Sequence, residues 1–284
     1  MGKKFLLLDC NYLCHRVKHS MAGLNYGGTP TGVIYGFLRY LPALQDLFRT
    51  SHFVFCWDSK TSKRKEIFPE YKANRHTKEL SKEEAVFENA FKYQMIKLRR
   101  QYLPMIGFRN IFVQKGYESD DIIASICASL NGYDEAVIVS CDKDLYQLIQ
   151  SNISFYDVRP NKILTTQGFK KQHDIIPFYW SLVKTLAGCS TDNVPGIKGV
   201  GEKTAVKYLK GELKKSTKAH QAIESKQGQE IYERNYNLVR LPFKGTKIFK
   251  LKPDKLSPAG WGKVTEMLGM KSIRDKYPFG KGRK

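Results

Sequence analysis

The chain has 284 residues, 42% of them hydrophobic and 26% charged, which favours a globular protein with a sizeable core over wholesale disorder. It carries 48 lysines and arginines against 27 acids, a net charge of +21. A polyanionic partner is therefore expected, nucleic acid before an anionic membrane surface. No apolar run approaches the roughly 20 residues that span a bilayer, and the first run stops at Leu8, too short for a signal peptide. We expect a cytoplasmic protein without a membrane partner.

Four short apolar runs predict buried strands, and helix-like segments follow them. The runs cover residues 5–8, 53–57, 111–113 and 136–139. This order predicts an α/β fold with a mostly parallel central sheet flanked by helices. Each run leads into an acid: Asp9, Asp58, Glu118 after a short loop, and Asp142. Because ligands bind at the carboxyl ends of the strands in open α/β sheets, these carboxylates should meet at one edge.

A basic segment follows the strand that ends before Asp58. Residues 60–78 hold seven bases against two acids, with Phe68 and Tyr71 among them. Such a run is often only a solvated surface, but its position places it beside the acidic edge. A long helix comes next, because Ser81 and Glu84 form a capping box and one face is apolar. The residues of that face are Phe87, Ala90, Phe91, Leu98 and Tyr102.

Further acids fall in the first turns of two predicted helices, where the helix dipole alone would favour them. The dipole is a weaker explanation here, because both helices follow strands that should be neighbours. Between Glu118 and Asp144 the chain has seven acids and a single base, Lys143. Carboxylate oxygens suit a divalent metal held next to a polyanion. The candidate metal ligands are Asp9, Asp58, Glu118, Asp120, Asp121, Asp142, Asp144 and Asp192.

The last third of the chain predicts helices around a glycine-rich hairpin. Residues 178–187 and 202–209 read as helices, and residues 188–201 between them are rich in glycine. Small residues at a helix N-terminus let backbone amides approach one phosphate strand without reading a base. The predicted organisation is an α/β domain over residues 1–175, a helical region with the glycine-rich hairpin over 176–270, and a basic tail over 271–284.

The motifs together resemble the 5′-nuclease (flap endonuclease) family, which includes phage 5′-exonucleases and the 5′-nuclease domain of bacterial DNA polymerase I. The resemblance covers roughly residues 4–240. It rests on Leu-Leu-Leu-Asp9, Thr-Gly-Val-Ile-Tyr-Gly-Phe-Leu at 31–38, Trp57-Asp58, Pro69-Glu-Tyr71-Lys72-Ala-Asn-Arg75, Gly116-Tyr-Glu118-Ser-Asp120-Asp121, Ser140-Cys-Asp142-Lys-Asp144, and Asp192-Asn-Val-Pro-Gly-Ile-Lys-Gly-Val-Gly-Glu-Lys-Thr-Ala. The small size and the lack of an attached polymerase favour a stand-alone phage or bacterial enzyme.

The resemblance implies a PIN-like fold and a metal-dependent nuclease that cuts DNA with free or flapped 5′ ends in replication or repair. Residues 1–175 would be its catalytic domain, with a helical arch at about 60–100, and residues 176–270 its DNA-binding region. Branched or RNA-primed DNA would be the partner and the protein a monomer. Magnesium would be the cofactor, with manganese as its substitute, and a potassium ion is a further possibility at residues 196–204. Lys72 and Arg75 would be catalytic, offsetting charge on the scissile phosphate. The expected DNA contacts are Arg16, Lys63, Arg64, Tyr71, Gly196, Gly199, Gly201, Lys203 and Thr204. For Tyr71, a core position beneath the arch is an equal alternative to stacking on a base.

One departure from the family pattern concerns the second of its two metal groups. The family has an acid where this chain has Cys189, in Gly188-Cys-Ser-Thr-Asp192-Asn. A neutral thiol is a poor magnesium ligand, so we expect the second metal to be weakly held. The alternatives to a nuclease of this family are a non-catalytic binder of branched DNA and a PIN-like ribonuclease. The glycine-rich hairpin argues against the ribonuclease, and the retained acids argue against the binder.

Overall fold

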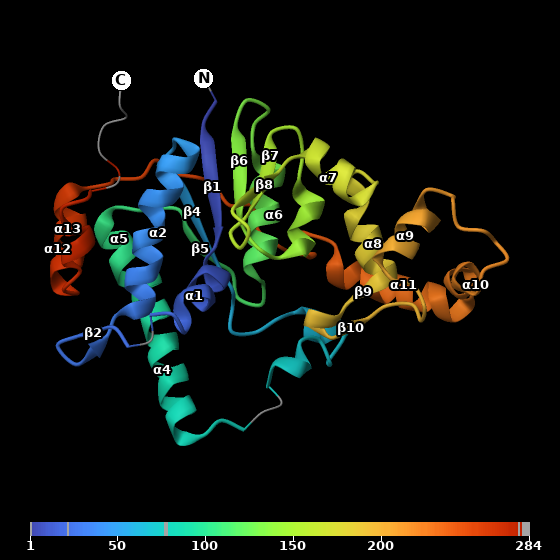
Figure 1. The fold of residues 1–284 in the computed structure, drawn as a ribbon, viewed down its shortest axis with the longest axis horizontal. Helices are drawn as coiled ribbons and strands as arrows, with labels where there is room; N and C mark the ends of the chain where they lie inside the picture. The colour runs from blue at the N-terminus through green and yellow to red at the C-terminus, as the bar shows by residue number, and fades with distance from the viewer. Residues whose placement is uncertain (1, 22, 77–78, 278, 280–284) are drawn as a thin grey trace.

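A six-stranded sheet lies at the centre of the molecule (Figure 1). The computed structural model describes residues 2–21, 23–76, 79–277 and 279. The strand order is β5–β4–β1–β6–β7–β8, parallel except for the antiparallel pair β7–β8. The four predicted strands are confirmed as β1 (Lys4–Asp9), β4 (His52–Trp57), β5 (Ile111–Val113) and β6 (Glu135–Ser140). The sequence reading missed β7 (Ile153–Asp157) and β8 (Lys162–Leu164).

Alternation along the strands divides the core into two layers, one on each face of the sheet. Leu6 and Leu8 of β1 are buried on the face covered by α1 (Cys10–Lys18), α2 (Gly32–Phe48) and α5 (Leu103–Ile106). Phe5 and Leu7 are buried on the face covered by α6 (Ser119–Ser129) and α8 (Trp180–Ala187). A sheet covered on both faces needs apolar side chains at every central position, which explains the continuous apolar runs.

The predicted arch begins at the end of β4 and projects away from the sheet (Figure 1). It contains α3 (Arg64–Ile67), a 3₁₀ turn (Ala73–His76) and α4 (Lys82–Lys97), which continues through a π-helical turn (Leu98–Tyr102) into α5. The predicted capping box at Ser81 is present, with both hydrogen bonds formed. Helix α4 packs on α1, where Lys18 pairs with Glu88 and the rings of His15 and Phe91 lie 4.6 Å apart. A β-hairpin precedes α2, formed by β2 (Asn25–Tyr26) and β3 (Thr29–Pro30).

The second half of the chain is mostly helical. A 3₁₀ turn (Lys143–Leu148) and α7 (Thr166–His173) precede a 3₁₀ turn (Pro177–Tyr179) and α8. A short ladder of β9 (Gly188–Cys189) and β10 (Val194–Pro195), with a 3₁₀ turn (Ser190–Asp192) between them, leads to α9 (Glu202–Leu209), α10 (Lys218–Glu224) and α11 (Lys226–Val239). Helices α9 and α11 both pack on α8. The predicted helices 178–187 and 202–209 correspond closely to α8 and α9.

The chain then crosses the β5 edge to α12 (Pro258–Met267) and α13 (Lys271–Arg274), which lie beside α5 (Figure 1). Trp261 is fully buried, and its ring lies 5.9 Å from that of Phe279, which also contacts Phe53 and Phe108. Helix α12 therefore belongs with the first core layer, not with the helices around the hairpin. The first part of the predicted basic tail is folded, whereas residues 278 and 280–284 lie outside the described residues. Among the described residues, no helix is long and apolar enough to cross a membrane.

Candidate active site

A cavity of about 750 Å³ opens at the carboxyl edge of the sheet. Register places Asp9, the last residue of β1, opposite Cys56 near the end of β4. Loops and helix starts from β4, β5 and β6 add their acids at the same edge, as the sequence predicted. Six of the eight predicted metal ligands line this cavity: Asp9, Asp58, Glu118, Asp120, Asp142 and Asp144.

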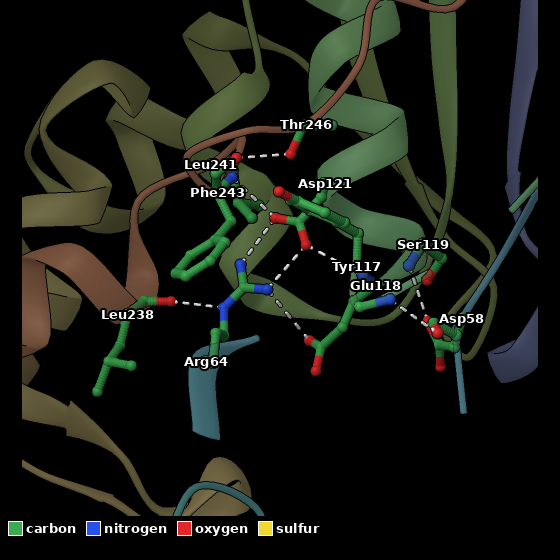
Figure 2. Close-up of polar contacts among 12 residues, drawn as sticks. Asp58, Arg64, Tyr117, Glu118, Ser119, Asp121, Leu238, Leu241, Phe243 and Thr246 are labelled. Carbon is green, nitrogen blue, oxygen red and sulfur yellow. Dashed lines mark hydrogen bonds and ion pairs between the residues drawn. The ribbon is translucent and has the colours of Figure 1, made fainter. Parts of the chain in front are cut away.

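Two serines orient the acids at the bottom of the cavity. Asp9 caps α1 by accepting a hydrogen bond from the amide of Tyr12. Its carboxylate also accepts bonds from the hydroxyls of Ser119, at 3.2 Å, and Ser140, at 2.7 Å. The amide of Ser119 donates to Asp58 at 2.8 Å (Figure 2). Sequence reasoning missed both serines, although each stands inside a motif beside a predicted acid.

Most of these carboxyls have raised pKa values because they are buried close to one another. Burial, and then the charge of Asp58, raises the pKa of Asp9 to about 7. Burial, and then the charge of Asp142, also raises the pKa of Asp144 to about 7. The pKa of Asp120 is raised well above its usual range by burial and Asp142. Such crowding is unfavourable for ionised acids and would be relieved by a divalent cation.

Glu118 is the exception, because cations surround it. Its carboxylate accepts hydrogen bonds from the hydroxyl of Tyr71, at 3.0 Å, and from Nζ of Lys72, at 2.7 Å. Burial opposes ionisation of Glu118, but Lys72 and Arg64 outweigh it, and the net effect is a lowered pKa. Lys72 has a left-handed backbone, with φ of 56°, and its amide donates to the carbonyl of Asp192 at 2.8 Å.

A second cluster lies beside the first and contains the cysteine noted in the sequence. The ligand atoms of Asp144, Cys189 and Asp192 all lie within 4.8 Å of one another. Three cations lie beside the acids of this cluster, one of them Lys72, whose Nζ is 3.7 Å from Asp192. Nζ of Lys184 is 3.4 Å from Asp144, and Nη2 of Arg75 is 2.6 Å from Asp192. Burial, followed by the charge of Asp144, raises the pKa of the Cys189 thiol to about 11, so the thiol is protonated at neutral pH. Lys184 was not singled out from the sequence.

Three predicted site residues take internal roles. Asp121 is fully buried, and its carboxylate accepts hydrogen bonds from Nη1 and Nη2 of Arg64, each at 2.8 Å (Figure 2). It is therefore not placed to hold a metal in the cavity. Arg64 is only 3% exposed, which rules out the predicted DNA contact. Tyr71 is also 3% exposed, which agrees with the predicted core position beneath the arch and not with stacking on a base.

The remaining predicted DNA contacts lie at the surface or in the glycine-rich hairpin. Arg16, Lys63 and Lys203 are exposed, and Thr204 is partly buried in α9. Gly196 is needed for packing, since a Cβ there would lie 2.2 Å from the backbone of Ala187. A Cβ at Gly199 or Gly201 would meet open space, and Gly199 has a φ of +78°. Gly199 and Gly201 are thus exposed at the start of α9, on either side of the buried Val200.

A mostly parallel sheet with crowded carboxylates at its carboxyl edge and basic segments around them is typical of metal-dependent enzymes that act on phosphate esters. Residues 4–174 match the family described as "5′-3′ exonuclease, N-terminal resolvase-like domain". The chain therefore belongs to the 5′-3′ exonuclease family, and it is a nuclease.

Curated relatives and solved structures agree with this placement. The chain is 31% identical over 220 residues to a 5′-3′ exonuclease of Bacillus subtilis, with 74% of this chain and 70% of that protein covered. It is 29% identical over 285 residues to the thermostable DNA polymerase I of Thermus thermophilus, covering 98% of this chain but 32% of the polymerase. The fold resembles the T5 5′-exonuclease solved with zinc, with a TM-score of 0.71 at 20% identity and 97% of both chains covered. It also resembles the catalytic core of Rad2 in complex with DNA substrate, with a TM-score of 0.57 at 15% identity, covering 96% of this chain and 91% of the other.

Proposed function

We propose that this protein is a divalent-metal-dependent 5′ nuclease that hydrolyses DNA with free or flapped 5′ ends near the junction of single and double strand, in replication or repair. The observation that carries the proposal is the meeting of six carboxylates with Lys72 and Arg75 around one open cavity. The substrate class is supported by the structural relatives, which include a T5 flap endonuclease complex with DNA and metal ions. The protein is proposed to act in the cytoplasm as a monomer.

The donor set of the cavity fits magnesium, with manganese as a substitute, because hard carboxylate oxygens are the ligands that these ions prefer. Asp9, Asp58, Glu118, Asp120 and Asp142 would hold a first group, and Asp144 with Asp192 a second. When bound, such ions activate water and stabilise the charge on the oxygens of the phosphodiester being cleaved. The raised pKa values of Asp9 and Asp144 support this assignment, since burial and a neighbouring carboxylate, Asp58 and Asp142 respectively, make both sites favourable for an added cation.

The chain's own residues would bind and orient the substrate. Lys72 and Arg75 belong to the arch and line the cavity, so they would meet a phosphate that enters from the arch side. Their charges would stabilise negative charge on the transferred phosphorus centre, which is often the largest contribution of a fixed active-site group. Ser119 and Ser140 hold the carboxylate of Asp9 in a single orientation. Covalent catalysis by a protein nucleophile is not required.

The duplex part of the substrate would lie along the glycine-rich hairpin and α9. Amides at the start of α9 and the exposed side chain of Lys203 suit one phosphate strand, without base recognition. The open surface at Gly199 and Gly201 allows close approach of the backbone. A potassium ion bound by carbonyls of residues 196–204 belongs to the same proposal, as do Arg16 and Lys63 as outer phosphate contacts.

The proposal is tested with a 5′-flap duplex labelled at both ends, in magnesium, in EDTA, and with an Asp58→Asn control. We expect metal-dependent cleavage near the junction that is lost in the variant. The product ladder then distinguishes a single endonucleolytic cut from stepwise 5′→3′ removal. Tight binding without cleavage, even in manganese, would instead identify a branched-DNA binder in which Cys189 has disabled the second metal group.

A further inference from the structure

Arg64 lies at the foot of the arch but points inward, between three segments that are far apart in the sequence. Figure 2 shows its guanidinium between the side chain of Asp121 and the carbonyl of Leu238. The two nitrogens Nη1 and Nη2 each bind one carboxylate oxygen of Asp121 at 2.8 Å, and Nε donates to the carbonyl of Leu238 at 2.8 Å. Nothing of this arrangement faces solvent, because Arg64 is 3% exposed and Asp121 is fully buried. An arginine fork paired with a carboxylate in this way is rigid.

The pair fixes Glu118, which stands in the first proposed metal group. Asp121 accepts a hydrogen bond from the amide of Glu118 at 3.0 Å and so completes the capping box of α6. Nη1 of Arg64 lies 3.8 Å from the Glu118 carboxylate itself. Both the backbone and the side chain of Glu118 are therefore held from the protein side by the Arg64–Asp121 pair, while Tyr71 and Lys72 hold the carboxylate from the arch side.

The same pair also anchors the end of the helical region. Asp121 accepts a bond from the amide of Phe243 at 2.9 Å, and the Phe243 ring lies 4.8 Å from the guanidinium of Arg64. Leu238 belongs to the last turn of α11, the helix that packs on α8. One buried cation thus connects the arch, the start of α6 and the end of α11.

We propose that Arg64 is a positioning residue of the nuclease reaction, which with Asp121 sets the carboxylate of Glu118 for metal and ties it to the arch and to α11. This inference rests on the proposed metal-dependent function. It assigns to Arg64 no contact with DNA or with the reacting atoms. Groups that orient metal ligands from behind typically change metal affinity or activity by about 10- to 100-fold when they are removed.

The experiment measures Mn²⁺ binding to the free protein by calorimetry, binding of a 5′-flap duplex in EDTA, and thermal unfolding. Arg64→Lys keeps the charge but loses the fork. A second variant, Arg64→Met with Asp121→Asn, removes both buried charges together and keeps an amide oxygen as an acceptor, so that no unpaired ion is left inside. The matched control is Lys63→Met, one residue away on the exposed surface.

We expect the Arg64→Lys protein and the double variant to bind Mn²⁺ about tenfold or more weakly and to bind DNA in EDTA as the wild type does. Lys63→Met should bind Mn²⁺ as the wild type does and bind DNA in EDTA more weakly. Wild-type Mn²⁺ affinity in both Arg64 variants would overturn the inference, as would a loss of DNA affinity in EDTA with metal binding intact. A wild-type protein that binds no Mn²⁺ would refute the proposed metal-dependent function itself, which is a distinct result.

Discussion

Cys189 offers a direct test of how the proposed second metal group works. Its Sγ lies within 4.8 Å of a carboxylate oxygen of Asp144 and of Asp192, close enough for the three to share a metal ion. The thiol is nevertheless protonated at neutral pH, because burial and the neighbouring acids raise its pKa to about 11. Cys189→Asp would supply the acid that the family pattern has at this position. The variant therefore adds a hard oxygen ligand together with a buried negative charge.

The cost of that charge in the metal-free protein follows from the geometry. Two unit charges 4.8 Å apart repel by about 3.5 kcal/mol at an effective dielectric constant of about 20. Two such pairs would be formed, with Asp144 and with Asp192. The ammonium of Lys184 and the guanidinium of Arg75 offset much of this repulsion. We therefore expect a net destabilisation of about 1–3 kcal/mol, equivalent to a loss of about 2–5 °C in the unfolding midpoint.

Thermal unfolding in EDTA and in saturating magnesium measures the effect. Cys189→Asp should unfold below the wild type in EDTA and at or above it in magnesium, because the added carboxylate is neutralised by the bound ion. Calorimetry should show a second Mg²⁺ site that is tighter than in the wild type. Cys189→Ser, which adds an oxygen without charge, should behave as the wild type in EDTA. Equal metal dependence of the wild type and Cys189→Asp would refute the reasoning.

Three further outcomes are expected. Lys72→Met should lower the single-turnover cleavage rate at saturating DNA by about 10²–10³-fold, and a rate unchanged within twofold would exclude a catalytic role. Gly196→Ala should destabilise the fold by about 1–3 kcal/mol and so lower the unfolding midpoint, since its Cβ would clash with the α8 backbone. Gly201→Ala should leave the midpoint unchanged but weaken duplex binding in a filter or anisotropy assay. The pKa values of Asp9 and Asp144 are raised from 3.8 to about 7 on folding. The folded state thus binds more protons in that window, and metal-free stability measured by unfolding in EDTA should fall as pH rises through it, an effect that magnesium should abolish.

The sheet and its acidic edge could be predicted from the sequence because continuous apolar runs are a strong signal for strands buried on both faces. The strands β7 and β8 were missed because their signal is weak: β7 mixes Ser154 and Asp157 with apolar residues, and β8 has three residues. Asp120 and Asp121 show a different limit. Adjacent residues on a helix point about 100° apart, so only one of the two can face the cavity, and the sequence does not reveal which.

Arg64 and Lys63 show the same limit for bases. Both belong to one basic run, and a charge run by itself predicts exposure for all its members. The structure separates them, since Lys63 is exposed while Arg64 turns inward to a carboxylate more than fifty positions away in the chain. Recognising an internal role for Arg64 requires knowing that α3 and the start of α6 are neighbours in space. Local pattern cannot supply that information.

The charges around the site also give the second metal group a further reason to be weak, apart from Cys189. Asp144 and Asp192, its two acids, already hold Lys184 and Arg75, and Tyr71 donates a hydrogen bond to Asp192 at 3.1 Å. An incoming cation must compete with these partners. In the first group Glu118 also holds a cation, Lys72, at 2.7 Å. Burial and neighbouring acids nevertheless raise the pKa values of Asp9 and Asp120, so a metal ion that binds between these two carboxylates relieves repulsion. The first group should therefore fill before the second, whichever residue stands at position 189.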